Sequence, residues 1–437
     1  MRSKSTLAPE TMTAPSPLPR MHELTRAGGL RETISRQVAR LCFHTHGESL
    51  RAVVLTGSLA RNEATLVEER GSRRLLGDAE FLLIFHPWAP LPPKVAMNFL
   101  RQNIETSISR LGITGEMCLS AAHPKYLRSL RPDIFAYELQ NCGQVVGGDL
   151  EVLTLIPSFS PSDIPLEDGW RLLSNRMIEQ LEVLESLEQG PKLLSGPLLY
   201  RTLKLYLDMA TSFLLFVGEY APSYSERERR LKNLAETTGE NRNLPFDLGG
   251  FCDRVSECTR WKLSGTKIKN SSGGKTVSEF DSSWWEKAVE YAQLLWRWEL
   301  ASLVGTVEQA GNQELLEKWM KSQPATRRLR GWVHVARDQG WDGIRMNWRR
   351  WARLAWRASP RDWVYAGASH LFFQLPCTSE PAFEAMHFHQ KCETVLSHLP
   401  VSNHIELDPR GSRSTNWRRV ASVVAWNYGK FLKETRS

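Results

Sequence analysis

The pattern of hydrophobic and polar positions changes character once along the chain, after residue 156. Before that point, short apolar runs alternate with stretches in which apolar residues recur every three or four positions. The runs predict buried strands, and the stretches predict amphipathic helices. The predicted order is helix 30–43, strand 52–55, helix 62–69, charged loop 70–74, strand 80–85, helix 95–111, strand 113–119, helix 133–142 and strand 144–146. Such alternation is typical of an α/β unit.

After residue 156 longer helical patterns replace the short runs. Ser283 and Glu286 precede an apolar run in the arrangement of a capping box, which predicts the start of a helix. A polar stretch at 263–276, rich in Gly and Ser, predicts a surface loop. The other predicted features of this region are a Ser- and Pro-rich linker at 157–165 and helices at 170–187, 198–217 and 283–303.

These patterns divide the chain into four predicted parts. They are a tail at 1–20, an α/β domain at 21–156, a helical domain at 166–310 and a basic, Trp-rich helical region at 311–437. The tail is rich in Pro, Ser and Thr and lacks the apolar core of a signal peptide, so we expect it to be disordered.

Composition narrows the class of protein. The 437 residues carry 56 Lys and Arg against 48 Asp and Glu, a net charge of +8, which favours anionic partners such as nucleotides without implying nucleic-acid binding. Seven cysteines include no Cys-x-x-Cys pair, which predicts mostly buried free thiols in a reducing, cytoplasmic protein. No apolar stretch approaches the roughly 18 residues of a membrane-spanning helix, so we expect no membrane partner.

Candidate chemistry is concentrated in the first domain. Gly57 and Ser58 follow a predicted strand and precede a predicted helix, where a glycine lets the backbone approach a phosphate closely. Asp78 and Glu80 lie two positions apart at the start of a strand, so both side chains point to the same face. Two neighbouring carboxylates repel and call for a cation or raised pKa values, and Mg²⁺ suits such a pair. Glu116, in the next predicted strand, is a candidate third ligand or general base.

Two segments that contain these residues resemble the signature of the polymerase-β-type nucleotidyltransferase superfamily, namely TGSLARNE at 56–63 and GDAEFL at 77–82. The signature is a Gly-Ser turn, an Arg and an acidic residue, then an acidic-x-acidic strand. The resemblance implies a small mixed sheet with helices, followed by a mainly helical region that completes the active-site cleft. It also implies transfer of a nucleoside monophosphate from an NTP to an acceptor with two Mg²⁺ ions. The aminoglycoside nucleotidyltransferases are similar in layout and in their Asp and Glu pair.

The resemblance also assigns roles. Gly57, Ser58 and Arg61 would bind the nucleotide, and the acidic pair would bind the metal ions with Glu116 as the third carboxylate. The chain departs from the family in two respects. Gly57 and Asp78 are 21 positions apart, which is roughly nine more than usual, so that 67–75 would be an inserted loop or hairpin. Asn62 also replaces the more usual Gly.

The helix predicted at 198–217 carries a polar stripe of Tyr200, Lys204 and Asp208. Because the family commonly packs a helical domain against the nucleotide, Lys204 is a candidate ligand of the triphosphate. The alternative is a surface ion pair between Lys204 and Asp208, which contributes little stability. The segment 218–224, which follows this helix, is a candidate lining of the acceptor side or an ordinary helix-ending turn.

Two further patterns have weaker implications. A stripe of arginines four positions apart, with tryptophans nearby, is typical of nucleic-acid binding or, more often, of a solvated helix face with Trp residues in the core. The stripe consists of Arg345, Arg349, Arg353 and Arg357, beside Trp348, Trp351 and Trp356. His387, His389 and Cys392 are metal-ligand types, but residues two apart on a helix do not face each other.

Three functions are compatible with the sequence. The leading hypothesis is a Mg²⁺-dependent nucleotidyltransferase that moves an NMP from an NTP to a hydroxyl of a small acceptor and releases pyrophosphate. The second has tRNA, another nucleic acid or a protein as acceptor, and the basic stripe motivates it. The third is a nucleotide-binding or interaction protein that keeps the fold without catalysis.

Overall fold

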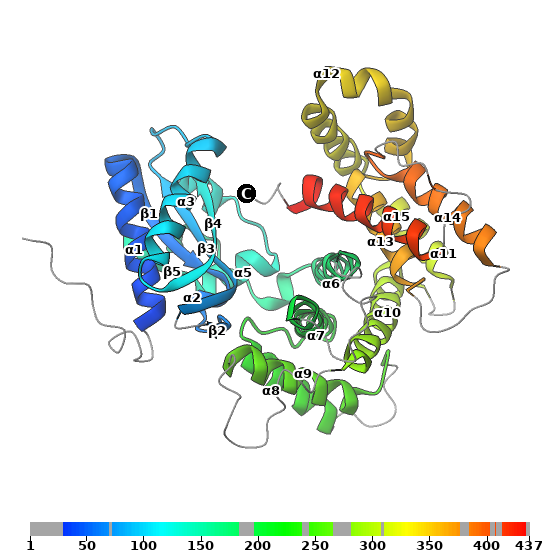
Figure 1. Ribbon diagram of the computed structural model, residues 1–437, viewed down its shortest axis with the longest axis horizontal. Helices are drawn as coiled ribbons and strands as arrows, with labels where there is room; N and C mark the ends of the chain where they lie inside the picture. Colours follow the sequence, from blue (N-terminus) through cyan, green and yellow to red (C-terminus); the bar gives the residue numbers. More distant parts are fainter. Residues whose placement is uncertain are drawn as a thin grey trace, which may run out of the picture.

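The computed structural model describes residues 29–69, 72–182, 196–237, 244–264, 281–306, 310–375, 384–402, 407 and 413–433. The predicted tail at 1–20 and nearly all of the predicted loop at 263–276 lie outside these ranges. Figure 1 shows a sheet with its helices at one end of the molecule, in blue and cyan, and an all-helical region from green to red at the other. The mixed first part and helical remainder agree with the sequence.

A five-stranded, mostly antiparallel sheet organises the first part. Strand β3 (Ser72–Phe85) is central, with β1 (Leu50–Thr56) antiparallel along one edge and β4 (Ile113–Ala122) parallel along the other. Strand β5 (Gln144–Gly148) pairs with β1, and β2 (Leu66–Glu69) pairs with the first half of β3. The parallel β3–β4 pair makes the sheet mixed, and helix α3 (Lys94–Ser109) supplies the crossover that this pair requires.

Helices cover both faces of the sheet. On one face, α1 (Gly29–His46) and α3 bury residues such as Ile34 and Ile104 against Phe81, Leu83 and the strand residues beside them. The other face has a smaller cluster that includes Leu82, Leu127 of α4 (Pro124–Arg128) and Leu139 of α5 (Ile134–Cys142). On this second face the cluster includes only residues of the second half of β3, so the same face of the first half is not covered by α4 or α5.

The predicted helix at 62–69 is wrong, and so is the part of the predicted loop at 70–74 that the structure describes, residues 72–74. Helix α2 ends at Ala60 (Gly57–Ala60), and Asn62 has a positive φ of 59°, which helices do not accommodate. Residues 66–69 instead form β2, where Leu66 pairs with Leu75 across the hairpin. Strand β3 therefore starts at Ser72, eight residues before the predicted strand. The extra residues between Gly57 and Asp78 form an antiparallel hairpin, one of the two forms expected for the insertion.

The helical part shares one hydrophobic core, which runs from Trp170 to Tyr428 and spans both helical parts predicted from sequence. Trp170 lies near its centre, with ring centroids 4.4 Å from Trp319 and 6.0 Å from Trp296. The helices are α6 (Leu166–Leu181), α7 (Gly196–Phe216), α8 (Tyr224–Thr237), α9 (Leu248–Ser264), α10 (Ser282–Val304), α11 (Asn312–Ser322), α12 (Ala325–Arg357), α13 (Pro360–Phe372), α14 (Glu384–His398) and α15 (Arg413–Tyr428).

Two local predictions in this part need correction. The N-cap of α10 is Asp281, whose carboxylate accepts a hydrogen bond from the backbone N–H of Ser283, so Ser283 and Glu286 do not form the predicted capping box. Helix α12 is interrupted at Gly340, whose φ of 66° turns it into two antiparallel halves. Trp348 and Trp356 on its second half are exposed, whereas Trp351 is buried. The predicted packing of the tryptophans in the core therefore holds only for Trp351.

The thiols follow the sequence prediction within the described residues. The six cysteines there are all free, and Cys42, Cys252, Cys258 and Cys392 are buried; Cys377 lies outside the described ranges. Within those ranges, no helix has both the length and the apolar composition needed to cross a membrane.

Glu299 of α10 is buried in the helical core, and neither carboxylate oxygen has a hydrogen-bond partner among the described residues. Burial raises its pKa well above the ordinary value of 4.5, and the nearby Ser212 hydroxyl acts in the opposite direction. The folded protein therefore keeps the proton, whereas the unfolded chain loses it above about pH 4.5. The contribution of Glu299 to the free energy of unfolding is therefore fully present below about pH 4.5. It is lost as the pH rises, because the unfolded chain then releases the proton that the folded protein keeps.

We expect Glu299→Gln, which imitates the protonated acid, to raise the free energy of unfolding at pH 7, because the amide folds without the proton uptake that the buried carboxyl group requires. The gain should vanish at pH 4. Urea unfolding at several pH values measures it. Glu286→Gln, an exposed carboxylate of the same helix, should change stability by less than about 0.5 kcal/mol. A gain for Glu299→Gln that is independent of pH would contradict the assignment.

Candidate active site

The acidic residues predicted from sequence lie on one face of the sheet, at its uncovered end. Asp78 is in register with Glu116 on β4, and Glu80 is in register with Cys118 on β4 and with Thr56 on β1. Because residues opposite each other on neighbouring strands point to the same face, these side chains share a surface. Farther along β3 the same face carries Leu82 and Ile84, which belong to the smaller core cluster.

Gly57 lies directly against Glu80. Its φ is 69°, and a Cβ built there would lie 3.0 Å from Cδ of Glu80 and 3.1 Å from its Oε2. A larger residue would therefore be strained and would displace the carboxylate. The turn that begins at Gly57 and the acidic pair meet despite the 21 intervening positions, because the hairpin of β2 and β3 absorbs the extra residues. Helix α2 is only four residues long, and the first four N–H groups of a helix have no partner within it, so those of Gly57 and Ser58 are suited to a phosphate.

The acidic pair lacks a direct counterion. Neither Asp78 nor Glu80 forms a hydrogen bond or ion pair with a residue that the structure describes. Burial, followed by the charges of Asp78 and Glu138, raises the pKa of Glu80 to about 7, while Arg61 and Lys204 act in the opposite direction. A half-buried carboxylate with so high a pKa is typical of a functional site.

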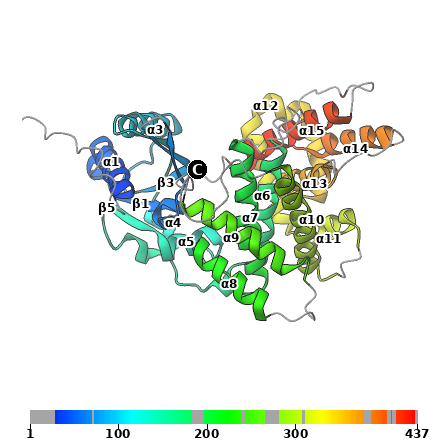
Figure 2. The same cartoon turned by 60° about the horizontal axis from the view of Figure 1, so that its bottom comes forward.

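The helical part supplies the opposite wall. Tyr200 of α7 reaches the strand, since a Cβ built at Gly77 would lie 3.2 Å from its hydroxyl oxygen. Lys262 of α9 donates a hydrogen bond of 3.4 Å to that hydroxyl, and Nζ of Lys204 lies 5.8 Å from the Tyr200 ring centroid. Thr65 donates a hydrogen bond to the backbone carbonyl of Lys262. Figures 1 and 2 show α7 and α9 on the side of the helical part that adjoins the sheet.

Both lysines are held in an environment that disfavours their charge. Burial, and then the charges of Lys204 and Arg61, lowers the pKa of Lys262 to about 8. The charge of Arg176, followed by burial, lowers the pKa of Lys204, whereas Glu179, Asp208 and Asp78 favour its protonated form. A buried and a half-buried lysine whose charges are disfavoured suit the binding of an anion, which would stabilise both charges.

The ion pair considered for Lys204 is not formed. Asp208 instead pairs with Arg176 of α6, and Lys204 has no salt bridge with any residue in the described ranges. Lys204 therefore remains a candidate ligand. Lys262 was missed by the sequence analysis, because it lies near the end of a helix that was not predicted and carries no motif.

Arg61, predicted to bind nucleotide, is occupied by a buried ionic network. Its guanidinium donates to Glu63 at 2.9 Å and to Glu138 of α5 at 2.5 Å, and the side chain is 7% exposed. Glu138 also accepts from Arg227 of α8 at 2.5 Å and from the Tyr220 hydroxyl at 2.9 Å. The network joins the sheet part to the helical part, so that Arg61 positions the two walls of the site.

The segment 218–224 takes part in the same junction. Glu63 accepts hydrogen bonds of 2.8 Å from the Ser223 hydroxyl and from the backbone N–H of Tyr224. The segment is therefore more than a helix-ending turn, since it docks the start of α8 on the sheet part.

The role of Glu116 as a third metal ligand stays a prediction. Glu116 is exposed on β4, and no group of three His, Cys, Asp or Glu side chains within the described ranges is arranged to hold a metal ion. The candidate metal ligands are therefore the carboxylates of Asp78 and Glu80. Their oxygen atoms suit Mg²⁺, which binds one or two carboxylates together with substrate phosphates. The side chains of His387 and His389 lie outside the described ranges, and Cys392 is buried.

Comparison with known proteins adds no relative. No family model matches the chain, and no curated protein matches it either.

Proposed function

We propose that the protein is a Mg²⁺-dependent nucleotidyltransferase that moves an NMP from an NTP to a hydroxyl of a small acceptor. The observation that carries the proposal is the position of Glu80. It lies against Gly57, has no counterion at hydrogen-bond distance, and lies on a strand that Tyr200 of the lysine-bearing wall contacts. The acidic pair and the lysines lie near each other without forming ion pairs. Such an arrangement suits a ligand that brings both metal ions and phosphates.

In this proposal Asp78 and Glu80 hold Mg²⁺, which when bound neutralises phosphate charge. Gly57 and Ser58 bind the triphosphate through the backbone, and Lys204 with Lys262 neutralises its remaining charge. The acceptor oxygen forms a bond to the α-phosphorus while the bond to pyrophosphate breaks. The proton of the acceptor hydroxyl passes to Glu116, which lies in register with Asp78. Arg61 orients the site through Glu63 and Glu138 rather than binding phosphate.

A nucleic-acid acceptor is the second candidate function. Helix α12 contains nine arginines and two aspartates, and Arg345, Arg349 and Arg353 are exposed beside Trp348. An exposed basic and aromatic surface is typical of proteins that bind single-stranded nucleic acid. A filter-binding titration against RNA over a range of salt concentrations distinguishes the two, because electrostatic binding weakens steeply with salt.

A screen with radiolabelled NTPs tests the main proposal. Each NTP is incubated with the full chain and Mg²⁺ in the presence of aminoglycosides, sugars, tRNA or no acceptor. We expect label to move to one acceptor class with release of pyrophosphate, and EDTA to abolish the transfer. NTP binding by calorimetry without turnover on any acceptor would instead favour a nucleotide-binding protein that does not catalyse.

A further inference from the structure

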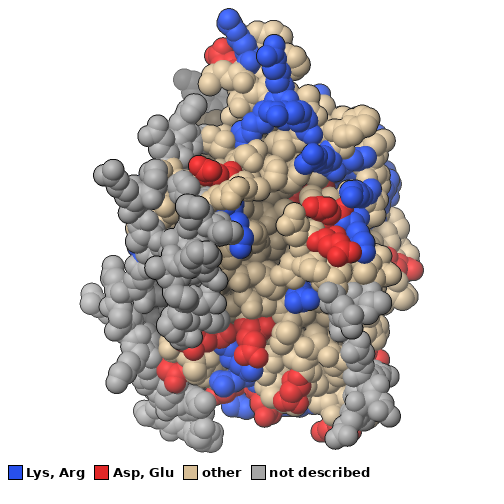
Figure 3. All heavy atoms as spheres, turned by 90° about the vertical axis from the view of Figure 1, so that its right-hand side faces the viewer, with Lys and Arg blue, Asp and Glu red and all other residues tan. Residues whose placement is uncertain are grey.

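A cavity lies in the helical part, between α11, α13, α14 and the two ends of α12. Its volume is about 1020 Å³, at the upper end of the range for small-molecule sites. Figure 3 shows this side of the molecule, where Lys and Arg gather over α12 at the top and the surface below them is hollowed. No residue assigned to the proposed active site lines this cavity.

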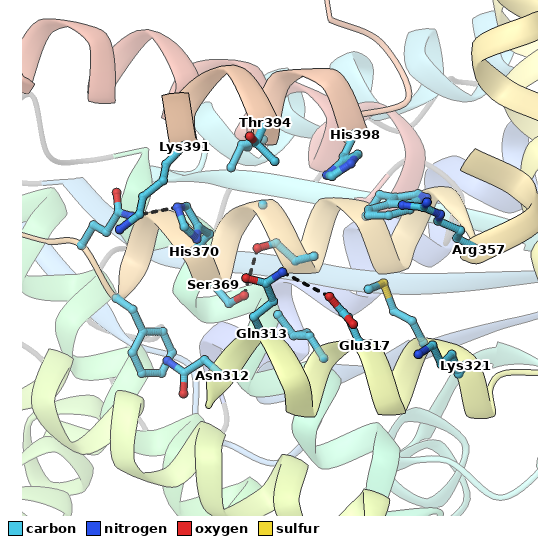
Figure 4. Close-up of a pocket in the computed structure, with 18 of the residues that line it drawn as sticks. Asn312, Gln313, Glu317, Lys321, Arg357, Ser369, His370, Lys391, Thr394 and His398 are labelled. Atoms are coloured by element: carbon cyan, nitrogen blue, oxygen red, sulfur yellow. Dashed lines mark hydrogen bonds between the residues drawn. The ribbon is translucent and has the colours of Figure 1, made fainter. Parts of the chain in front are cut away.

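The cavity has an excess of positive charge. Four cationic side chains line it, against the single carboxylate of Glu317, which accepts a hydrogen bond from Gln313 at 3.1 Å. Figure 4 shows Arg357 and Lys321 at one end and Lys391 with His370 at the other. Low-dielectric walls strengthen the attraction of such a cavity for an anion. The four cations are Lys321, Arg328, Arg357 and Lys391.

The two ends differ in the hydrogen bonds that they leave open. At the Arg357 end, Arg328 donates to the carbonyls of Trp356 and Arg357, yet its buried Nε has no partner among the described residues. At the other end, Oδ1 of Asn312 and Oε1 of Gln374 are likewise buried and unpartnered. The Arg328 Nε therefore needs an acceptor, and the two oxygens at the other end need donors, which a ligand can supply, since buried polar atoms rarely remain unsatisfied.

Flat and apolar side chains line the space between these ends. The ring of His398 stacks on Trp363 with centroids 4.4 Å apart, and Leu316, Met320 and Val395 add apolar surface. Burial, followed by the charges of Arg357 and Arg350, lowers the pKa of His398, so the ring is neutral at pH 7 and suited to stacking. From residue 312 to 321 helix α11 rises about 14 Å, which gives the length of this lining.

We propose that this cavity binds a nucleoside monophosphate or a close analogue, at a site separate from the catalytic one. The phosphate lies at the end formed by Arg357, Lys321 and Arg328. The flat ring lies along His398, and its amino or hydroxyl donors meet Asn312 and Gln374.

Photolabelling of the full chain with 8-azidoadenosine 5′-monophosphate, followed by peptide mass spectrometry, tests the proposal. We expect label in peptides from α11, α13 and α14, whereas the phosphate-free 8-azidoadenosine should label them at least fivefold less. The double variant Lys321→Glu, Arg357→Glu should lose at least tenfold of the labelling at the same probe concentration. Both side chains are exposed, so the fold should tolerate the change.

Lys318→Glu is the matched control, since Lys318 lies on α11 outside the cavity and pairs with Glu314. It should keep labelling within twofold. Equal labelling by nucleotide and nucleoside would overturn the proposal, as would label confined to the sheet part or insensitivity to the double variant. The nucleoside comparison uses the unaltered protein, so the result stands even where a variant fails to fold. Because peptides report the location, failure here is distinguishable from failure of the proposed catalytic function.

Discussion

Asp78→Asn should reduce nucleotidyl transfer at least 100-fold while leaving the fold intact. The side chain is exposed and forms no hydrogen bond or ion pair with a described residue, so stability should change by less than about 0.5 kcal/mol. The amide removes one of two negative charges that we propose to bind Mg²⁺, and a charge that stabilises phosphoryl transfer is worth a factor of 10² to 10³ or more. Initial rates of transfer from radiolabelled NTP to the acceptor found in the screen measure the effect.

Glu48→Gln serves as the control, because Glu48 is an exposed carboxylate of the same part of the chain, outside the site. It should retain full activity.

Lys204→Met should behave differently from both, raising KM for the NTP more than it lowers kcat, because we propose that Lys204 binds the triphosphate in the ground state as well as in the transition state. Undiminished transfer by Asp78→Asn would remove the acidic pair from the mechanism.

Glu138→Ala should destabilise the protein by about 3 kcal/mol. The carboxylate accepts from Arg61 and Arg227, whose side chains are 7% and 4% exposed, and from the Tyr220 hydroxyl. Removing one partner of a buried ionic network leaves the remaining charges uncompensated, which costs about 3–5 kcal/mol, and the partial exposure of Glu138 favours the lower value. Urea unfolding monitored by tryptophan fluorescence measures the loss.

Glu151→Ala provides the comparison, since Glu151 is exposed and distant from the network; its effect should stay below about 0.5 kcal/mol. The double variant Glu138→Ala, Arg227→Met should be less destabilised than the sum of the two single changes, because each single change strands the other charge. Strict additivity would show that the two residues do not act together. Because the network holds the two walls of the site, Glu138→Ala should also lower the transfer rate.

Local features of the fold were predictable where one periodicity dominated. The helix at 30–43 and the strands at 52–55 and 80–85 correspond to α1, β1 and β3. The region 62–69 was assigned wrongly because a short segment of alternating polarity is ambiguous, and the pairing of Leu66 with Leu75 decided its conformation. Helices α8 and α9 were missed since their apolar residues face a shared core that no local window shows.

The sequence by itself determined that the two carboxylates share one face of a strand and that a glycine begins the neighbouring turn. Strand alternation fixes that Asp78 and Glu80 point the same way, and the Gly57 turn follows from the residue type. Only the tertiary structure decided which groups meet them. Lys262 lies 184 positions after Asp78, and its approach to Tyr200 depends on how α9 packs against α7. The structure also decided that Arg61, a predicted nucleotide ligand, pairs with Glu63 and with Glu138 of α5. Only packing brings the carboxylate of Glu138 beside this guanidinium.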